Sequence, residues 1–460
     1  MQTLRHARST GAMSRSIIVA AVLALAAVAQ SAPLLAQSSL DANIQRLAAP
    51  NPELAAFYAS RQYRPLWVRG AALEQEADIL LDLLRTAEAD GRDPNRYLRL
   101  GVREATERAR GGSPEALALA EVVLSSAFAA YVRDVRRPAD IGVTYGEPSL
   151  RNRIPRILTV LHRAAAAPSL EHYLRNIGWM HPLYAGLRHA LARAPLDGAG
   201  AMSGDDERLV RLNLERARIL PAHQKRYILV DAAAAQLFYY EGGNVRDSMR
   251  VVVGTPDEET PLMVGMIRYA TLNPYWHVPT DLARTRIAPR VLSEGLSYFH
   301  ERGYEVVTEW SRSARVIDPA KIDWKAVAQG KKQVLVRQRP GPRNGMGKIK
   351  FQFPNELGIY LHDTPAKQLF NEDQRGFSAG CVRLEDAEGL GRLLFGRDPQ
   401  TASREPEQTV VLPEPVPVYI TYLTAVSENG RIVERRDVYG RDKERLAAAT
   451  RPKGNGSSVQ

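Results

Sequence analysis

The sequence has very little cysteine: Cys381 is the only one among 460 residues. A single thiol excludes a disulfide within the chain. The nine histidines form no H-E-x-x-H motif and no pair at i, i+4 spacing, and no zinc-finger spacing is present. We therefore predict no metal site and no cofactor.

Motifs for binding nucleotides and nucleic acids are also missing. The segment from Arg343 to Lys348 has glycines and a lysine but lacks the G-x-x-x-x-G-K-[ST] spacing of a phosphate loop. The formal net charge of +11 and the pI near 9.7 indicate an anionic partner. Because no arginine-rich run carries interleaved aromatic residues, we predict no nucleic-acid partner. Anionic lipid and an acidic cell-wall polymer stay open.

An apolar run near the N-terminus, Ile17 to Ala29, follows three arginines and is too short for a comfortable membrane span. It predicts a secretory signal peptide over residues 1–36, cut after Ala36 or, at an A-x-A pattern, after Ala29. The mature protein is then exported and has no transmembrane span. Since oxidising compartments favour disulfides, an unpaired thiol in an exported protein needs burial or a function.

The most informative stretch runs from Leu357 to Leu384. Its apolar alternation predicts a half-buried strand over Leu357–Leu361 that ends at His362. A polar loop follows, and the chain re-enters structure just before Cys381. A lone thiol after a glycine, with a histidine at a strand end, is typical of a Cys–His nucleophile pair. The alternative is a buried structural cysteine, which the polar flanks make less favourable.

Patterns along the chain predict an α+β protein. We expect a helical scaffold domain over residues 40–225 and a β-rich domain over 226–445. The β-rich domain carries an inserted, mostly helical subdomain at about 281–330, and residues 446–460 form a disordered tail. Predicted helices include Pro52–Tyr58, Leu73–Ala87, Ala116–Val132 and Asp386–Leu394; predicted strands include Tyr227–Val230, Gln236–Tyr240, Met249–Val253, Ile267–Leu272, Val334–Arg337, Lys348–Phe353 and Val416–Thr424.

The segment from Arg337 to Leu384 resembles the catalytic segment of the L,D-transpeptidases, which have a YkuD-type domain. The matching segments are RQRPGPRNGMGKIKFQFPN, YLHDTP and SAGCVRLED, and the segments NPYWHVP, VPVYITY and VYGRD support the resemblance. The chain is most similar to the large Gram-negative periplasmic form of the family, the YcbB type. Two departures stand out. Ala379 replaces a histidine of the general family pattern, and the peptidoglycan-binding module of the large form is missing, with only a short stretch around residues 196–204 in its place.

The resemblance implies a periplasmic enzyme that crosslinks peptidoglycan through a thioester on a tetrapeptide donor stem and releases D-alanine. Cys381 is then the nucleophile, and His362 is the general base and acid. The backbone carbonyl of Asp363 orients that histidine, and the Gly380 amide stabilises the oxyanion. Candidate substrate contacts are Arg383, Tyr360, Ser378 and Asn344. The implied partners are peptidoglycan stem peptides, with other cell-wall synthases or hydrolases as further candidates, and carbapenems are expected to acylate the thiol.

Three alternatives use the same residues differently. Water could resolve the thioester, which gives a carboxypeptidase, or a lysine of another protein could do so, which gives an anchoring enzyme. From a different class, the protein could be a non-catalytic wall-binding scaffold with a vestigial thiol. The sequence does not choose the acceptor.

Overall fold

The computed structural model describes residues 39–99, 101–137, 140–194, 202–311, 313–399 and 405–449. The predicted signal peptide lies outside these ranges, as does most of the stretch around residues 196–204. Of the predicted disordered tail over residues 446–460, residues 450–460 also lie outside them. The prediction is wrong for residues 446–449, which form the end of helix α16 (Arg441–Ala449). The described chain forms two compact units, one from residues 1–137 and 153–182 and one from 138–152 and 183–460. This division differs from the predicted boundary near residue 225, because residues 183–225 pack with the β-rich unit.

The first unit is helical. Asn51 caps helix α2 (Pro52–Ser60) by accepting hydrogen bonds from the backbone N–H groups of Glu53 and Leu54, as its position before Pro52 suggests. After a helical stretch at residues 39–48, the unit contains α2 (Pro52–Ser60), α3 (Gln75–Arg85), η1 (Ala87–Asp90), α4 (Asn95–Leu98), α5 (Val102–Ala109), α6 (Pro114–Val135), α7 (Ile157–Ala165) and α8 (Leu170–Arg175), with a short hairpin of β1 (Val68–Arg69) and β2 (Ala72–Leu73).

Helix α6 is the centre of this unit. It is long and apolar enough to cross a membrane by length and composition, but 67% of its apolar window is buried inside the unit. It also buries a carboxylate, Glu121, which accepts hydrogen bonds from the backbone N–H groups of Leu66 and Trp67 and from the Tyr58 hydroxyl. These contacts are typical of the core helix of a folded domain.

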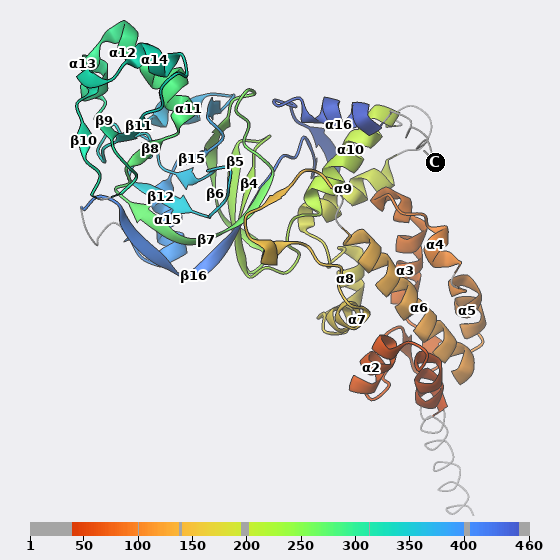
Figure 1. Ribbon diagram of the computed structural model, residues 1–460. Helices are drawn as coiled ribbons and strands as arrows, with labels where there is room; N and C mark the ends of the chain where they lie inside the picture. Colours follow the sequence, from red (N-terminus) through yellow and green to blue (C-terminus); the bar gives the residue numbers. More distant parts are fainter. Residues whose placement is uncertain are drawn as a thin grey trace, which may run out of the picture. The chain divides into compact units, whose positions relative to one another are not determined.

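The second unit is built on a β-barrel (Figure 1). The strand order is β12-β13-β15-β6-β5-β4-β16-β7, and a pairing between β7 and β12 closes the ring. Strand β3 adds to the outer edge of β7, and β14 pairs with β6. The strands are β3 (Thr144–Tyr145), β4 (Arg226–Asp231), β5 (Gln236–Glu241), β6 (Asn244–Gly254), β7 (Met263–Leu272), β12 (Ile349–Gln352), β13 (Leu361–His362), β14 (Gly376–Ser378), β15 (Val382–Leu384) and β16 (Gln408–Thr421).

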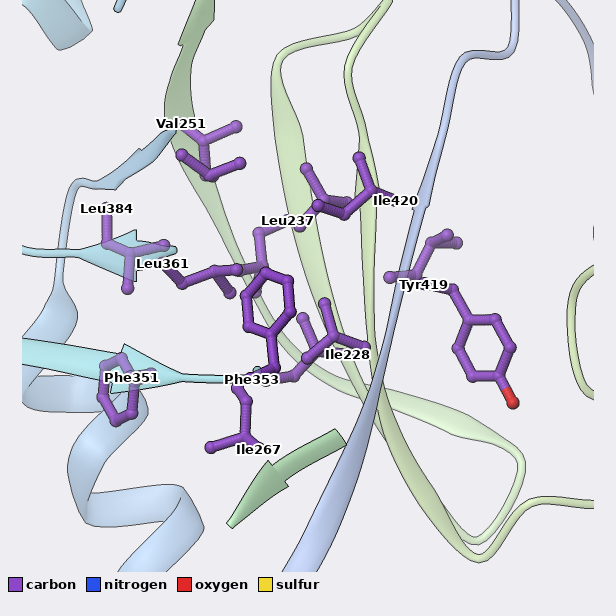
Figure 2. Close-up of a cluster of buried hydrophobic side chains, with 14 of the residues drawn as sticks. Ile228, Leu237, Val251, Ile267, Phe351, Phe353, Leu361, Leu384, Tyr419 and Ile420 are labelled. Carbon is purple, nitrogen blue, oxygen red and sulfur yellow. The ribbon is translucent and has the colours of Figure 1, made fainter. Parts of the chain in front are cut away.

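Apolar side chains from around the ring fill the barrel. Figure 2 shows Leu237, Val251, Phe353, Leu361 and Leu384, which come from different parts of the chain, converging on the same core. Because successive side chains of a strand point to opposite faces, the residues between these core positions lie on the outside of the barrel. Helices and short elements of the same unit are α9 (Pro182–Arg193), α10 (Gly204–Ala217), α15 (Ala387–Phe395), α16 (Arg441–Ala449), η2 (Pro148–Leu150), η5 (Lys367–Asn371), and the hairpin of β17 (Ala425–Glu428) and β18 (Arg431–Glu434).

An inserted subdomain, which we call the cap, interrupts the barrel between β7 and β12. Its four-stranded sheet has the order β10-β9-β11-β8, and its helices pack on that sheet around a separate apolar core (Figure 1). The elements are β8 (Trp276–Val278), α11 (Thr280–Leu282), η3 (Ala283–Ile287), α12 (Ala288–Glu294), α13 (Leu296–Glu301), β9 (Tyr304–Val307), β10 (Val316–Ile317), η4 (Pro319–Lys321), α14 (Trp324–Ala328) and β11 (Leu335–Gln338).

The structure confirms the α+β fold class. Helices dominate residues 281–330 as predicted, but the cap also contains a sheet and takes in the flanking strands β8 and β11. The predicted strand over Leu357–Leu361 is wrong. Residues 354–360 have no regular structure, and only Leu361 and His362 form β13. The alternation did reflect burial, because Leu357 is 52% exposed whereas Ile359 and Leu361 are buried.

Candidate active site

Three polar side chains form one rung on the outside of the barrel. Lys350 of β12 pairs with His362 of β13, and His362 pairs with Arg383 of β15. Residues directly opposite one another on neighbouring strands point to the same face of the sheet. The sequence neighbours Ile349, Phe351, Leu361, Val382 and Leu384 belong to the barrel core. Lys350, His362 and Arg383 therefore share the outer face.

Cys381 and Tyr360 continue this face by one strand step. The Val382 N–H donates to the Tyr360 carbonyl at 2.9 Å, which extends the parallel pairing and sets Cys381 beside Tyr360. The Tyr360 ring lies against the ammonium of Lys350, and the positive charges of Lys350 and Arg383 act on the Cys381 thiol, so both side chains lie on the side of the rung. Cys381 is partly exposed, with its Sγ 3.5 Å from the Gly358 carbonyl oxygen. The fold thus brings the four predicted residues Cys381, His362, Tyr360 and Arg383 to one face.

The imidazole of His362 is buried and held by its own loop. Its Nδ1 lies 2.6 Å from the carbonyl oxygen of Asp363. That contact assigns the proton of the neutral ring to Nδ1 and leaves Nε2 as the acceptor. Burial, followed by the nearby positive charges of Arg383 and Lys350, lowers the pKa of His362 to about 3. At neutral pH the ring is uncharged and able to accept a proton.

The side chain of Asp363 fixes the loop that carries this carbonyl. Its carboxylate accepts the Lys348 backbone N–H at 2.9 Å and the Lys367 ammonium at 2.8 Å. Gly347 makes room for it: the glycine has φ of 61°, and a Cβ there would lie 2.2 Å from Asp363 Oδ2. A larger residue at 347 would displace the carboxylate, so this glycine is required by close approach as well as by its backbone conformation.

The turn before Cys381 is built by Ser378, Ala379 and Gly380. Gly380 has φ of 93°, a conformation that favours glycine, and its carbonyl accepts the Thr260 hydroxyl at 2.8 Å. Ala379 packs against the apolar core of the cap. Ser378 is buried and donates its hydroxyl to the Cys381 carbonyl at 2.6 Å. We therefore correct the predicted substrate contact of Ser378 to a structural role in the turn.

Asn344 also has a structural role. It is 1% exposed, and its side-chain N–H groups donate to the carbonyls of Pro274, Gln338 and Arg339. Its side-chain oxygen accepts the Met346 N–H at 2.7 Å. Because backbone groups occupy both ends of the amide, the predicted contact between Asn344 and substrate is wrong. The residue shapes the turn that leads into β12.

Lys350 is a site residue that the sequence interpretation missed. Its Nζ lies 3.8 Å from the centre of the Tyr360 ring, and desolvation lowers the pKa of its ammonium. The signal was visible in the predicted strand over Lys348–Phe353, where Lys350 and Gln352 alternate with apolar residues. Within the described part of the chain, neither Lys350 nor Arg383 has a carboxylate within salt-bridge distance.

The positive charges of Lys350 and Arg383 act to lower the pKa of the Cys381 thiol. Burial raises the pKa of Cys381, while a hydrogen bond from the backbone and the charges of Lys350 and Arg383 oppose that rise. The resting pair at neutral pH is a neutral thiol beside a neutral imidazole. Such a pair can act by general-base transfer of the thiol proton as the sulfur attacks.

A cavity of about 730 Å³ lies beside the Asp363 loop. Gly347, Lys348, Asp363, Thr364 and Lys367 line it, but Cys381 does not. Among the residues that the structure describes, no group of three or more His, Cys, Asp or Glu side chains gathers to hold a metal ion.

Comparisons with known proteins agree with this geometry. The L,D-transpeptidase catalytic domain family, YkuD, matches residues 225–394, and the Scaffold domain family matches residues 52–191. A Haemophilus influenzae protein named "Putative L,D-transpeptidase" is 29% identical over 402 residues, which cover 85% of this chain and 78% of that protein.

Two solved structures are also similar: the Ldtfm–avibactam carbamoyl enzyme, at 14% identity, and an L,D-transpeptidase from Mycobacterium smegmatis, at 11% identity. Both have a TM-score of 0.21; the first match covers 44% of this chain and 50% of that chain, and the second covers 43% and 58%. The YkuD match takes in the barrel strands from β4 to β15, with His362 and the Cys381 turn, whereas the barrel strand β16 follows the matched residues. Residues 225–394 of this chain therefore form an L,D-transpeptidase catalytic domain of the YkuD family, preceded by a Scaffold domain over residues 52–191.

Proposed function

We propose that this enzyme forms peptidoglycan crosslinks between diaminopimelate residues through a thioester on Cys381. The observation that carries the proposal is the outer face of the barrel, on which Cys381 and His362 share one surface with Lys350 and Arg383, two cations that have no carboxylate partner within the described residues. A thiol, a neutral imidazole and positive charge are what acyl transfer from an anionic stem peptide requires.

In the first half-reaction, Cys381 Sγ attacks the carbonyl between the third residue and the terminal D-alanine of a tetrapeptide stem. His362 Nε2 takes the thiol proton as the carbon–sulfur bond forms. The bond to D-alanine then breaks, and the imidazolium gives that proton to the leaving amine. The Asp363 carbonyl at Nδ1 keeps the ring in the tautomer that this transfer needs.

In the second half-reaction, the side-chain amine of another stem attacks the thioester. The amine loses a proton to His362 as the new amide forms, and the thiol is released and reprotonated. The Gly380 turn supplies backbone amides for the oxyanion in both steps. Arg383 and Lys350 attract the carboxylates of the stem, and Tyr360 forms a wall of the cleft.

We further propose that the enzyme acts in the periplasm after removal of residues 1–36. The arginines and the apolar run at the N-terminus support export. Intact mass of the protein recovered from a periplasmic extract tests this directly: a chain that starts at Gln37 or Gln30 is expected, and a full-length chain in the cytoplasmic fraction would contradict it.

The reaction is tested by intact mass of the mature protein after incubation with a carbapenem and, separately, with a tetrapeptide muropeptide. Because the chain has one cysteine, an adduct that is absent from a folded Cys381→Ala variant has a single site. We expect an adduct with both reagents and a crosslinked dimer product. Shortened stems without dimers would identify a carboxypeptidase, and no adduct on folded protein would identify a wall-binding scaffold.

A further inference from the structure

A second cavity, of about 470 Å³, lies where the cap meets strand β16. Its lining combines the rings of Tyr275, His277 and Trp310 with Arg337, Glu407 and Thr409. This volume lies within the range of small-ligand sites. The catalytic steps above use none of these residues.

The rings of this cavity form an ordered aromatic wall. Tyr275 and His277 are stacked with an interplanar angle of 12°, and the centre of the His277 ring lies 4.8 Å from that of Trp310. Trp310 keeps 44% of its surface exposed, although large aromatic side chains are usually covered. The wall therefore offers an aromatic face to a ligand.

Polar groups beside the wall are held in fixed positions. The Arg337 guanidinium lies over the Tyr275 ring at 4.4 Å and forms an ion pair with Glu305 at 2.8 Å. Glu407 accepts the Tyr275 N–H at 2.6 Å, which holds its carboxylate at the edge of the cavity. Burial lowers the pKa of His277, so its ring is neutral at pH 7 and presents one donor and one acceptor.

This combination suits a pyranose ring. A sugar presents an apolar C–H face, which packs on an aromatic ring, and a rim of hydroxyl and acetamido groups, which bind carboxylates and other fixed polar groups. Hydroxyl and acetamido groups of a sugar can add hydrogen bonds to the Glu407 carboxylate and the Arg337 guanidinium, which a purely apolar ligand cannot do.

The cavity lies on the same face of the barrel as the thiol, and the pairing of the strands gives the distance between the two along the sheet. Thr409 pairs with Thr271, Thr271 with Lys350, and Lys350 with His362. Three steps between neighbouring strands place Thr409 about 14 Å from His362 along the sheet, and a fourth step, from β13 to β15, places it about 19 Å from the strand that Cys381 precedes. In peptidoglycan, a donor stem joins an N-acetylated amino sugar through its first residue. Its first three residues span about 10 Å when extended, before the link to the sugar is added.

We propose that this cavity binds the N-acetylated amino sugar that carries the donor stem. The inference rests on the proposed function and extends it from the stem to the glycan strand. When the third residue of the stem lies at Cys381, the three extended stem residues cover about half of the distance to Thr409. The link to the sugar and the sugar itself extend the donor further toward the aromatic wall. The cap thereby binds the donor at its sugar, while Cys381 contacts the reacting carbonyl at the other end of the stem.

The test compares two donors, a free tetrapeptide and the same tetrapeptide carrying its disaccharide, by the rate of D-alanine release. We expect kcat/KM to be about tenfold higher for the disaccharide donor, because stacking on one ring contributes up to about 1.4 kcal/mol. In Trp310→Ala this ratio falls to about one. Trp310→Phe, which keeps a ring, retains most of the ratio.

Leu292→Ala is the matched control, since Leu292 is a 53% exposed apolar residue of the cap outside the cavity. Its ratio should equal that of the wild type. A wild-type ratio near one would overturn the proposal. So would equal losses for both donors in a folded Trp310→Ala variant, because Trp310 would then act on the stem or on the cap itself.

A binding measurement separates this inference from the chemistry. N,N′-diacetylchitobiose carries the amino sugar without a stem, and saturation-transfer NMR detects its contact with the full mature protein. Binding by the wild type that is lost in Trp310→Ala supports the site even if neither donor releases D-alanine. No contact with the wild type would overturn it even if the enzyme is active.

Discussion

At the scale of single residues, Lys350 contributes to the reactivity of Cys381. The thiol lies in surroundings that raise its pKa, and the neutral His362 offers no positive charge to lower it. Lys350 is therefore one of the few groups that favour the thiolate, together with Arg383 and a backbone hydrogen bond.

Replacing Lys350 by methionine removes a positive charge while it keeps most of the side-chain volume. We expect the pKa of Cys381 to rise further, so that alkylation by iodoacetamide at pH 8 slows about threefold or more. In both proteins the alkylation rate should keep rising with pH beyond the usual range of a free cysteine. Lys348→Met is the control, because that lysine is exposed and paired with Glu388. Equal rates in the wild type and Lys350→Met would refute the assigned role.

Gly347 is a second residue whose importance comes from its surroundings. In Gly347→Ala the new Cβ collides with the Asp363 carboxylate, which shifts the carbonyl that holds His362. We expect kcat to fall at least about tenfold, since misplacing a catalytic group by about 1 Å can cost a hundredfold. Gly243→Ala has the same kind of positive φ, with nothing within 4 Å of the added Cβ. It should lose only about 1 kcal/mol of stability and keep full activity.

At the scale of elements, helix α6 organises the scaffold unit around a buried carboxylate. Glu121 binds the backbone at the Leu66–Trp67 bend and the hydroxyl of Tyr58, so one side chain ties three segments together. Desolvation nonetheless dominates, and the pKa of Glu121 rises to about 7.

A carboxyl group whose pKa is higher in the folded state stabilises the fold while it is protonated. That contribution is complete below the unfolded pKa near 4.5 and is lost as the pH rises through about 7. Between pH 5 and pH 8 we expect the wild type to lose up to about 3 kcal/mol more unfolding free energy than Glu121→Gln, which cannot titrate. Urea titrations that follow the unfolding of the helical scaffold unit at each pH measure this difference in unfolding free energy. The exposed Glu115→Gln on the same helix should follow the wild type; parallel pH profiles for wild type and Glu121→Gln would contradict the assignment.

At the scale of the whole molecule, excess positive charge is the main long-range feature. Residues 1–36 contain three arginines and no acidic residue, so a chain cut after Ala36 carries 11 − 3 = +8. Peptidoglycan stems carry carboxylates, and the site itself adds two cations without carboxylate partners among the described residues. Electrostatic attraction between exposed charges is screened by salt.

We expect the mature protein to bind isolated sacculi about tenfold more weakly at roughly 0.5 M than at 0.05 M salt, because the Debye length shrinks severalfold. Co-sedimentation with sacculi measures the bound fraction. Chitin, which is uncharged, provides the comparison: its binding should change little with salt. Salt-independent binding to sacculi would show that net charge does not contribute.

The fold class and several secondary-structure elements of this protein follow from its local sequence. The α+β class, the β5–β6 hairpin at Gly242–Gly243, the capped helix at Pro52 and the His362–Cys381 segment were all predictable, because periodicity, caps and turns are properties of neighbouring residues. The resemblance to the L,D-transpeptidases likewise rests on motifs of contiguous residues.

Tertiary structure decided what depends on strand register and close packing. Closure of the barrel brings Lys350 beside His362, although nothing in either segment encodes that pairing. Packing also turns Ser378 and Asn344 inward to satisfy backbone groups, which a sequence motif cannot distinguish from substrate contact. The cavity at Trp310 exists only because the cap sheet and β16 meet there. Chain segments far apart in sequence become neighbours through the fold alone, so their shared chemistry appears only in three dimensions.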